Sequence, residues 1–335
     1  MKQKIIATNL DLTPTLKRQL DAIAPDYFLK SQDAINAKDL GRVEIILVDV
    51  MGANGKELVA KAAAMPRLRL IQSLRAGADS VDFSLIPQDV VYCGNVGAYS
   101  LPMGEFTIGM ILYLAKYLSV RNEKLKNGEA EYRNSILLHG KTIGVIGAGG
   151  IGQEVSKLAK SLGMKTIGVN TSGKPIPTFD KMYKTSGIDS VLKVSDVIVL
   201  SLPLNVNTFH IIDKRRLRLM KKNCVLVNVG RGYLIDERAL YDHLQKNPEF
   251  MCGLDVWWHY PKPGEKFVQR FPFLELPNFL GTPHVSGFVP EEREISIQSA
   301  LDNVQRFVMG RKLKGVISRD EYAGLSELIQ KAKTS

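Results

Sequence analysis

The chain has 335 residues, of which 45% are hydrophobic and 24% are charged, so it is long enough for two globular domains of about 150 residues each. Its cysteines, Cys93, Cys224 and Cys252, have neither the spacing of a metal site nor the density of a secreted disulfide framework, so we predict buried free thiols and no metal. The N-terminal residues lack the apolar core of a signal peptide and no apolar run reaches about 18 residues, so we expect a cytoplasmic protein without a membrane span.

A net charge of +11 raises the question of a nucleic-acid partner. The densest group of cations lies at 213–222, where Leu217 and Met220 fit the inner face of a short helix and the cations fit its outer face. No aromatic platform or recognition-helix pattern accompanies this group. We therefore expect no nucleic-acid partner, and we expect the positive charge to attract anionic substrates and dinucleotides.

The first part of the chain alternates between strand-like apolar runs and helices, which is typical of a βα domain with a parallel sheet. The predicted strands are 4–8, 43–50, 68–74 and 89–96, and the predicted helices are 13–24 and 55–65. A helix predicted at 102–126 follows, and it carries too many apolar residues for a single stripe. We expect this helix to bury against more than its own domain.

The segment 141–152, KTIGVIGAGGIG, begins with a predicted buried strand at 141–146 and continues with a glycine loop that leads into a helix. Gly147, Gly149 and Gly152 follow the pattern G-x-G-x-x-G. The first glycine permits a tight turn, the second lets a pyrophosphate approach the backbone, and the third lets the helix pack on the strand. The start of the helix presents oriented N–H groups to a phosphate, so this context predicts a dinucleotide site rather than a purely structural turn.

A second alternation of elements follows the glycine loop. The predicted strands are 165–169, 195–203, 223–230, 251–256 and 279–284, and the predicted helices are 151–162, 213–221, 236–246 and 290–309. After one strand, Leu202 and Pro203 form a loop that can lie against a dinucleotide without giving it any charge. We expect the strand ends of the two sheets to face a cleft between the domains, where α/β proteins bind ligands.

Two side chains at the ends of these later strands can do chemistry. Arg231, in VNVGRG, offers a planar fork that matches a carboxylate and can polarise an adjacent carbonyl. His284, in TPHVSG, titrates near neutrality and can move the proton that accompanies hydride transfer. Asp255 can hydrogen-bond a nicotinamide amide or simply cap a turn. For Arg231 and His284, a structural role is the alternative.

The segments GAGGIG, SLPLNVNT, VNVGRGYLIDERAL, GLDVWW and TPHVSG stand in this order, and with them nearly the whole chain resembles the D-isomer-specific 2-hydroxyacid dehydrogenase family. Its members include glycerate, phosphoglycerate, hydroxypyruvate/glyoxylate and formate dehydrogenases. The resemblance implies an α/β fold of two doubly wound parallel-sheet domains: a discontinuous flavodoxin-like substrate domain at 1–98 plus 287–335, and a Rossmann NAD(P)-binding domain at 99–286. It also implies that the apolar helix after Pro102 is a dimerisation segment. We therefore expect the protein to be a homodimer.

The resemblance further implies the roles of individual residues. Arg231 is expected to bind the substrate carboxylate and His284 to act as the acid/base. The substrate site is expected to include Arg75, Ala76, Gly77 and Tyr99, with backbone N–H groups of Ala76 and Gly77 on the carboxylate. The residues expected at the dinucleotide are Gly147, Gly149, Gly150, Ile151, Gly152, Asn170, Thr171, Ser172, Lys174, Leu202, Pro203, Thr208, Val229, Gly230, Arg231, Asp255 and His284.

One departure from the family concerns the partner of the histidine. The family's acid usually stands five residues after the aspartate of the L-D-V motif, and here that position is Tyr260. A carboxylate stabilises imidazolium, whereas a neutral tyrosine can only hydrogen-bond to it. Formate dehydrogenases also lack the acid, but they carry glutamine there. Glu265 is the one nearby substitute, and we expect it to lie in an exposed loop.

A second departure lies at the end of the strand that follows the glycine loop. Asn170 stands where NAD-specific members carry an acid for the ribose hydroxyls. Without that acid the repulsion against a 2′-phosphate is absent, and Thr171, Ser172 and Lys174 offer two hydroxyls and a cation. We therefore favour NADP(H) as the cofactor, with NAD(H) as the alternative if this segment is merely a polar turn.

These observations lead to one main hypothesis and two alternatives. The main hypothesis is an NAD(P)-dependent oxidoreductase that interconverts a small anionic 2-oxo acid, such as glyoxylate or hydroxypyruvate, and its D-2-hydroxy acid. The first alternative is a dehydrogenase of a formate-like anion, which the DVWW segment and the missing acid favour. The second is a non-catalytic, dinucleotide-sensing interaction protein like the family's corepressors.

Overall fold

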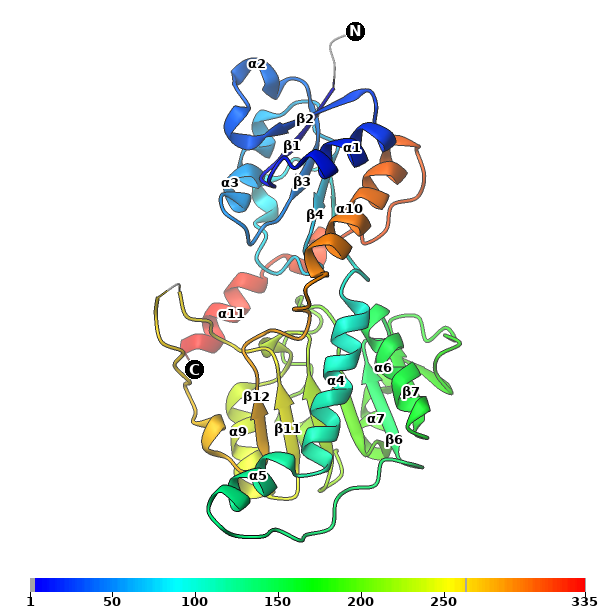
Figure 1. Cartoon of the computed structure of the whole chain (residues 1–335), viewed down its shortest axis with the longest axis vertical. Helices are drawn as coiled ribbons and strands as arrows, with labels where there is room; N and C mark the ends of the chain where they lie inside the picture. Colours follow the sequence, from blue (N-terminus) through cyan, green and yellow to red (C-terminus); the bar gives the residue numbers. More distant parts are fainter. Residues whose placement is uncertain (1–3, 263, 335) are drawn as a thin grey trace. The chain divides into compact units, whose positions relative to one another are not determined.

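The computed structural model describes residues 4–262 and 264–334, and its contacts divide the chain into two compact units (Figure 1). Unit 1 comprises Met1–Ala98 and Pro290–Ala323, and unit 2 comprises Tyr99–Val289 and Gly324–Ser335. The sequence assigned all of 287–335 to the first domain, whereas the contacts group the segment from Gly324 onward with unit 2. Each unit is built around a parallel sheet of its own.

Unit 1 contains a five-stranded parallel sheet in the order β2-β1-β3-β4-β5, which is the flavodoxin-like order. Its strands are β1 (Lys4–Thr8), β2 (Tyr27–Ser31), β3 (Val43–Val48), β4 (Leu70–Ser73) and β5 (Val91–Cys93). The inner strands are buried on both faces, which explains continuous apolar sequences such as that of β3. The sequence predicted these strands except β2, an edge strand in which exposed Phe28 and charged Lys30 interrupt the apolar pattern.

Helices cover both faces of this sheet. On one face, α1 (Pro14–Ile23) and α10 (Glu292–Val308) pack against each other and bury Leu20 and Leu301 in one core. Helix α3 (Gly55–Ala60) packs on the other face, and the short α2 (Ala37–Leu40) follows β2. Helix α10 begins almost 300 residues along the chain. The core on this face of the first sheet is therefore completed by a segment that is distant in sequence.

Unit 2 contains a seven-stranded parallel sheet in the order β12-β11-β10-β9-β6-β7-β8. Its strands are β6 (Thr142–Ile146), β7 (Lys165–Asn170), β8 (Lys181–Lys184), β9 (Val197–Leu200), β10 (Val225–Asn228), β11 (Met251–Leu254) and β12 (Phe279–Gly281). The direction of strand addition reverses between β6 and β9, and ligands of such sheets bind beyond the strand ends at this reversal. The predicted class of two doubly wound parallel-sheet domains is confirmed, although the edge strand β8 was missed.

The helices of unit 2 are α4 (Ser100–Ala115), α5 (Leu118–Lys126), α6 (Gly150–Ser161), α7 (Ile188–Val194), α8 (Lys214–Leu217), α9 (Glu237–Lys246) and α11 (Leu325–Thr334). Helices α4 and α6 lie side by side and share a core with the inner strands (Figure 1). The expectation of one helix over 102–126 is wrong, because Tyr117 takes a φ of 52° and separates α4 from α5. Helix α8 is also shorter than predicted, although Leu217 and Met220 are buried as expected.

Two further expectations concern single residues and membrane segments. Cys93, Cys224 and Cys252 are buried free thiols, as predicted. Across residues 4–262 and 264–334, no helix is both long and apolar enough to cross a membrane.

Candidate active site

The candidate site of unit 2 lies beyond the carboxyl ends of its parallel strands. Strands β6, β9, β10, β11 and β12 run in the same direction, so the loops that follow them gather at one edge of the sheet. The glycine loop follows β6, Arg231 follows β10, Asp255 follows β11, and His284 follows β12. The residues that the sequence singled out separately are therefore brought to one edge by the topology.

The glycine loop has the geometry that its pattern predicts. Gly147 takes a φ of 106°, and a Cβ there would lie 2.8 Å from the Leu202 nitrogen. A Cβ at Gly152 would lie 2.4 Å from the Gly147 carbonyl oxygen, so only glycine lets α6 start so close to the loop. Gly149 is not needed for close packing in this way, because the space that a Cβ would occupy there is open. As the N-cap of α6, it has no side chain that could cap the helix.

This geometry fits the phosphates of a dinucleotide. Helix α6 begins at Gly150, and the first N–H groups of an α-helix have no intrahelical acceptor. Gly150 and Ile151 lie partly exposed beside the open space at Gly149. An anion there meets unpaired N–H groups and the positive end of the helix dipole, without a Cβ in the way.

The turn after β7 contains the residues that were predicted to select the cofactor. The Asn170 side-chain oxygen accepts the Gly173 N–H at 2.5 Å and the Ser172 hydroxyl at 3.3 Å. The Lys174 N–H in turn donates to the Ser172 hydroxyl at 3.2 Å. Asn170 therefore shapes the turn, while Thr171, Ser172 and Lys174 are exposed and no carboxylate stands at 170–174.

The loop after β9 is tied by hydrogen bonds of Thr208. Its hydroxyl donates to the Pro203 carbonyl at 2.7 Å and accepts the Asn205 N–H at 2.8 Å. The Leu202 carbonyl oxygen would lie 2.8 Å from a Cβ at Gly230, which follows β10. The loops after β9 and β10 are therefore in close contact, and Thr208 holds the first of them in shape.

Arg231 stands in a turn that its neighbours hold rigidly. Val229 is buried, and the Asn228 side chain accepts the Gly230 N–H at 3.0 Å and donates to the Arg231 carbonyl at 2.8 Å. A Cβ at Gly232 would lie 2.3 Å from the Trp257 carbonyl carbon, so this turn packs directly on the loop after β11. The guanidinium of Arg231, partly exposed, donates to the Gly230 carbonyl at 2.8 Å.

His284 sits in a strained backbone conformation that Asp255 stabilises. Its φ is 62°, in the left-handed region that non-glycine residues rarely adopt. The buried Asp255 carboxylate accepts the N–H groups of Val285 and Ser286, each at 2.9 Å, and the Thr282 hydroxyl at 2.6 Å. Of the two roles considered for Asp255, the contacts favour the cap of the turn that carries His284.

The aromatic ring of Tyr260 lies against the ring of His284. Their centroids are 5.4 Å apart and their planes are tilted by 38°. The Tyr260 hydroxyl accepts the Trp257 N–H at 2.9 Å, so the phenol is anchored within its own loop. Glu265 is exposed, and its carboxylate accepts the Lys262 N–H in the loop after Tyr260.

Two residues beside His284 extend the site. Ser286 is 3% exposed, and its hydroxyl has no hydrogen-bond partner among the described residues, as expected where a polar ligand group completes the site. Tyr99 precedes α4, and its ring would lie 3.3 Å from a Cβ at Gly287. Ser286 was not predicted from the sequence, because a serine after a strand carries no signal until its burial is known.

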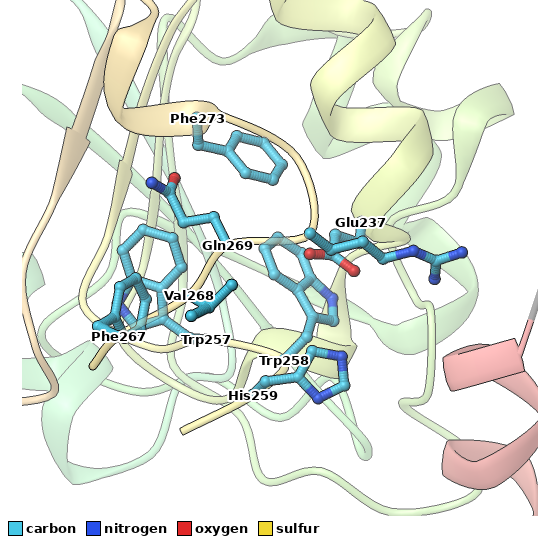
Figure 2. A pocket seen from close by; sticks show the side chains of 9 residues that line it. Glu237, Trp257, Trp258, His259, Phe267, Val268, Gln269 and Phe273 are labelled. Carbon is cyan, nitrogen blue, oxygen red and sulfur yellow. The ribbon is translucent and has the colours of Figure 1, made fainter. Parts of the chain in front are cut away.

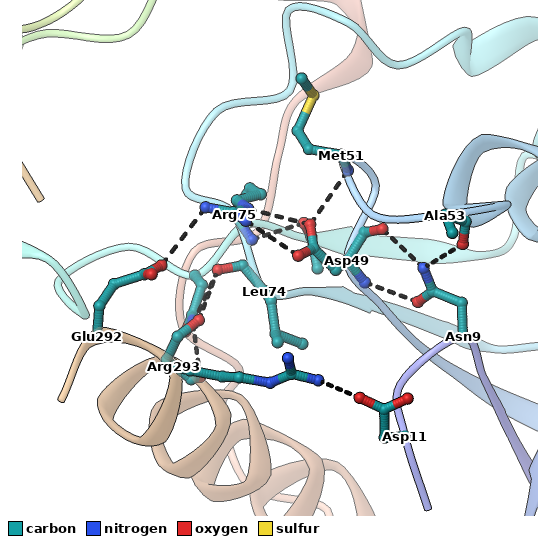
Figure 3. Close-up of polar contacts among 12 residues, drawn as sticks. Asn9, Asp11, Asp49, Met51, Ala53, Leu74, Arg75, Glu292 and Arg293 are labelled. Carbon is teal, nitrogen blue, oxygen red and sulfur yellow. Dashed lines mark hydrogen bonds and ion pairs between the residues drawn. The ribbon is translucent and has the colours of Figure 1, made fainter. Parts of the chain in front are cut away.

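In unit 1, the predicted substrate residue Arg75 follows β4, and Figure 3 shows its side chain between those of Asp49 and Glu292. Its guanidinium donates to both carboxylate oxygens of Asp49, each at 3.0 Å, and lies 3.5 Å from a Glu292 oxygen. Although burial acts in the opposite direction, the hydrogen bonds and charge of Arg75 hold the pKa of Asp49 below its usual value. Ala76 and Gly77 are partly exposed and follow this ion-paired arginine.

No cluster of three or more His, Cys, Asp or Glu side chains suited to a metal ion occurs within 4–262 and 264–334. The residues gathered at this edge of the sheet offer a phosphate cradle in the glycine loop, the cation of Arg231 and the imidazole of His284. This set suits a dinucleotide and an anionic substrate.

Comparison with known proteins connects this site to a family. The model for the NAD-binding domain of D-isomer specific 2-hydroxyacid dehydrogenases matches residues 108–286. The chain is 33% identical to a hydroxypyruvate reductase of Thermotoga maritima, over 69% of this chain and 75% of that protein. It is 32% identical to a D-3-phosphoglycerate dehydrogenase of Methanocaldococcus jannaschii over 78% of this chain, but it spans only 49% of that relative's length.

A solved structure from Pyrobaculum aerophilum, described as a candidate formate dehydrogenase, resembles the whole chain. It superimposes with a TM-score of 0.80 and 28% identity, covering 94% of this chain and 99% of that one.

Proposed function

Because the chain belongs to the D-isomer specific 2-hydroxyacid dehydrogenase family, whose members are NAD(P)-dependent oxidoreductases acting on CH–OH groups, we propose that it interconverts a small 2-oxo acid and the D-2-hydroxy acid. Glyoxylate and hydroxypyruvate are the substrates that we favour. The observation that carries this proposal is the placement of Arg231 and His284 after β10 and β12, on either side of β11 at one sheet edge.

Arg231 is assigned to the substrate carboxylate. Its turn is fixed by Asn228 and by the close packing of Gly232 on Trp257, so the guanidinium starts from a defined position. A planar guanidinium can bind a carboxylate through two hydrogen bonds and can draw electrons from an adjacent carbonyl. In unit 1, we assign the N–H groups of Ala76 and Gly77 to the same carboxylate.

His284 is assigned to the proton. Reduction of a carbonyl leaves an oxygen that takes up a proton, and oxidation of a hydroxyl releases one, so an imidazole that gives or takes this proton serves both directions. A bound nicotinamide dinucleotide supplies or accepts the hydride. Asp255 acts on this step indirectly, because it fixes the turn in which His284 lies.

The glycine loop and the turn at Asn170 support NADP(H) as the preferred cofactor. An aspartate or glutamate at the end of β7 would repel a 2′-phosphate, and Asn170 does not. The exposed hydroxyls of Thr171 and Ser172 and the ammonium of Lys174 can bind that phosphate. The buried hydroxyl of Ser286, for which the described part of the chain provides no hydrogen-bond partner, is assigned to the nicotinamide end.

The direct test is a substrate panel run with both cofactors. Glyoxylate and hydroxypyruvate should each oxidise NADPH faster than NADH, and Arg231→Ala should abolish most of this turnover. Arg18→Ala, which removes an exposed arginine in unit 1, is the matched control and should leave turnover unchanged. Nucleotide binding without turnover of any 2-oxo acid or of formate would instead support the sensor function.

Oxidation of a formate-like anion is the second candidate. Tyr260 stands at the position where the family usually carries an acid, and the candidate formate dehydrogenase of Pyrobaculum aerophilum resembles the chain over 94% of its length. Reduction of NADP⁺ or NAD⁺ by formate, with no activity on glyoxylate, would replace the first candidate by this one.

We also propose that the protein is a homodimer. Leu101 at the start of α4 is 59% exposed, and Leu118 and Leu125 on α5 are 47% and 68% exposed, which is unusual for large apolar side chains so close together in sequence. Equilibrium sedimentation should give twice the chain mass, and Leu125→Glu together with Leu118→Glu should give the mass of one chain.

A further inference from the structure

Unit 2 has a pocket beside the first turn of α9, in addition to the candidate active site. Its lining comes from His210, from Tyr233 after β10, from Glu237 on α9, from Trp258 after β11, and from Arg270. Neither Arg231 nor His284 lines it. The pocket is therefore separate from the groups that we assign to the dehydrogenase reaction.

Tyr233 lines this pocket, and the described residues provide no hydrogen-bond partner for its buried hydroxyl. The residue is 8% exposed, and no described residue hydrogen-bonds to its hydroxyl. Burial, together with the negative charge of Glu237, raises the pKa of Tyr233 to about 12, so the hydroxyl stays protonated and can donate as well as accept. A buried polar group without a partner is costly, and a ligand group that completes its hydrogen bonds removes this cost.

Glu237 provides a carboxyl group that is also unsatisfied. It is half-buried on the first turn of α9, and Figure 2 shows it beside Trp258 in a neighbouring pocket that both residues also line. Within the described ranges, no side chain or backbone group forms a hydrogen bond or ion pair with its carboxylate. Burial is the largest cause that raises the pKa of Glu237 to about 7; the charge of Arg270 opposes it and that of Asp236 adds to it. A cationic ligand group would stabilise the carboxylate.

The lining of the pocket also includes side chains of the opposite charge, Lys214, Arg238 and Arg270. Lys214 and Arg238 are exposed, and neither pairs with a carboxylate of the described part of the chain. Asp236, which also lines the pocket, uses its carboxylate to cap α9 at the Ala239 N–H, at 2.8 Å. Among the described residues, the lining thus offers an unpaired carboxylate and a phenol together with the unpaired cations of Lys214 and Arg238.

We propose that this pocket binds a small zwitterion of the amino-acid class, with its ammonium group on Glu237 and the Tyr233 hydroxyl and its carboxylate on Lys214 and Arg238. A purely anionic ligand would leave Glu237 unpaired and repelled. A purely cationic ligand would leave Lys214 and Arg238 without a partner, and its positive charge would be repelled by theirs.

The test is calorimetric titration of the full chain with the proteinogenic amino acids one at a time, with methylammonium and acetate as probes of each charge alone. At least one amino acid should bind the wild type, and both single-charge probes should bind at least about tenfold more weakly, because each makes only part of the contacts. Absence of binding by every amino acid, or acetate binding as tightly as the best amino acid, would overturn the proposal.

Variants locate the bound zwitterion. Glu237→Gln should weaken binding about tenfold or more, and Tyr233→Phe should weaken it severalfold, while Glu249→Gln, at an exposed glutamate, should leave it unchanged. Wild-type affinity of Glu237→Gln for NADPH shows that this variant is folded. Unchanged amino-acid binding by Glu237→Gln would place the ligand elsewhere and contradict the proposal.

The pH dependence gives a second readout of the same site. Since the Glu237 pKa is about 7, the carboxylate is mostly protonated at pH 6 and mostly charged at pH 8. Binding to the charged form should therefore be about tenfold weaker at pH 6 than at pH 8, and this difference should vanish in Glu237→Gln. An equal pH dependence in both proteins would show that Glu237 is not the group that binds the ammonium.

Discussion

The ring of Tyr260 lies 5.4 Å, centroid to centroid, from the ring of His284, at the position where the family usually places the acid that supports this histidine. The Tyr260 hydroxyl is engaged by the Trp257 N–H at 2.9 Å. His284 therefore contacts an aromatic ring from this position and gains no negative charge from it. The backbone of His284 is supported by Asp255.

A carboxylate at position 260 should change the pH dependence of turnover. In Tyr260→Glu the new negative charge stabilises the imidazolium, so the apparent pKa in the pH profile of kcat/KM should rise by about 1 unit. Tyr260→Phe keeps the ring but loses the hydroxyl, and its profile should keep the wild-type pKa. A profile of Tyr260→Glu that coincides with that of the wild type would mean that position 260 does not reach the titrating group.

The turn at Asn170 gives a test of cofactor preference. Asn170→Asp retains an oxygen that can accept the Gly173 N–H, so the turn should survive, but it adds a charge that repels a 2′-phosphate. The ratio of kcat/KM for NADPH to that for NADH should fall by about tenfold or more, which corresponds to about 1.4 kcal/mol. Lys165→Ala, at the exposed start of the same strand, should leave the ratio unchanged.

Asp255 should matter for both stability and turnover. In Asp255→Ala the buried N–H groups of Val285 and Ser286 lose their acceptor while His284 keeps its strained φ. The free energy of unfolding should fall by about 3 kcal/mol, measured by chemical denaturation. Asp255→Asn retains one acceptor oxygen and should lose less. An Asp255→Ala protein as stable as the wild type would refute the role of Asp255 as the cap of this turn.

Glu237 should make the protein less stable as the pH rises. Its pKa of about 7 in the folded chain lies above the ordinary value of 4.5, so the folded state binds the proton more tightly than the unfolded state. The stability contribution of the protonated form is complete below the unfolded pKa and is lost between about pH 4.5 and pH 7. Glu237→Gln should therefore raise Tm more at pH 8 than at pH 4.5. A gain in Tm that is equal at both pH values would contradict the raised pKa.

The sequence predicted the parts of this protein that depend on local backbone chemistry. The glycines at 147 and 152 could be assigned from their spacing, because no other residue fits their turn and their contact with α6. The placement of Arg231 and His284 at one sheet edge followed from the parallel direction of the strands that precede them. Strands β2 and β8 were missed because edge strands are half-exposed and lack a continuous apolar sequence.

Other features depend on contacts between distant segments and could not be predicted from the sequence. Packing sets the burial that raises the pKa of Glu237, and it leaves the hydroxyls of Tyr233 and Ser286 without a hydrogen-bond partner among residues 4–262 and 264–334. The pairing of Arg75 with Asp49 joins the ends of β4 and β3, and no local pattern indicates it. The sequence left two roles open for Asp255, and its contacts to residues about 30 positions later, which favour the cap of the turn, are not indicated by any local pattern.

The measurement that most directly tests the central claim compares turnover and nucleotide binding in Arg231→Ala. If Arg231 binds the substrate carboxylate, kcat/KM for glyoxylate or hydroxypyruvate should fall by about a hundredfold or more, because a charge-assisted, two-hydrogen-bond contact is lost. The dissociation constant for NADPH, measured by fluorescence titration of the same preparation, should stay within about twofold of the wild-type value. Retained turnover, or a loss of NADPH affinity that matches the loss of activity, would contradict the account.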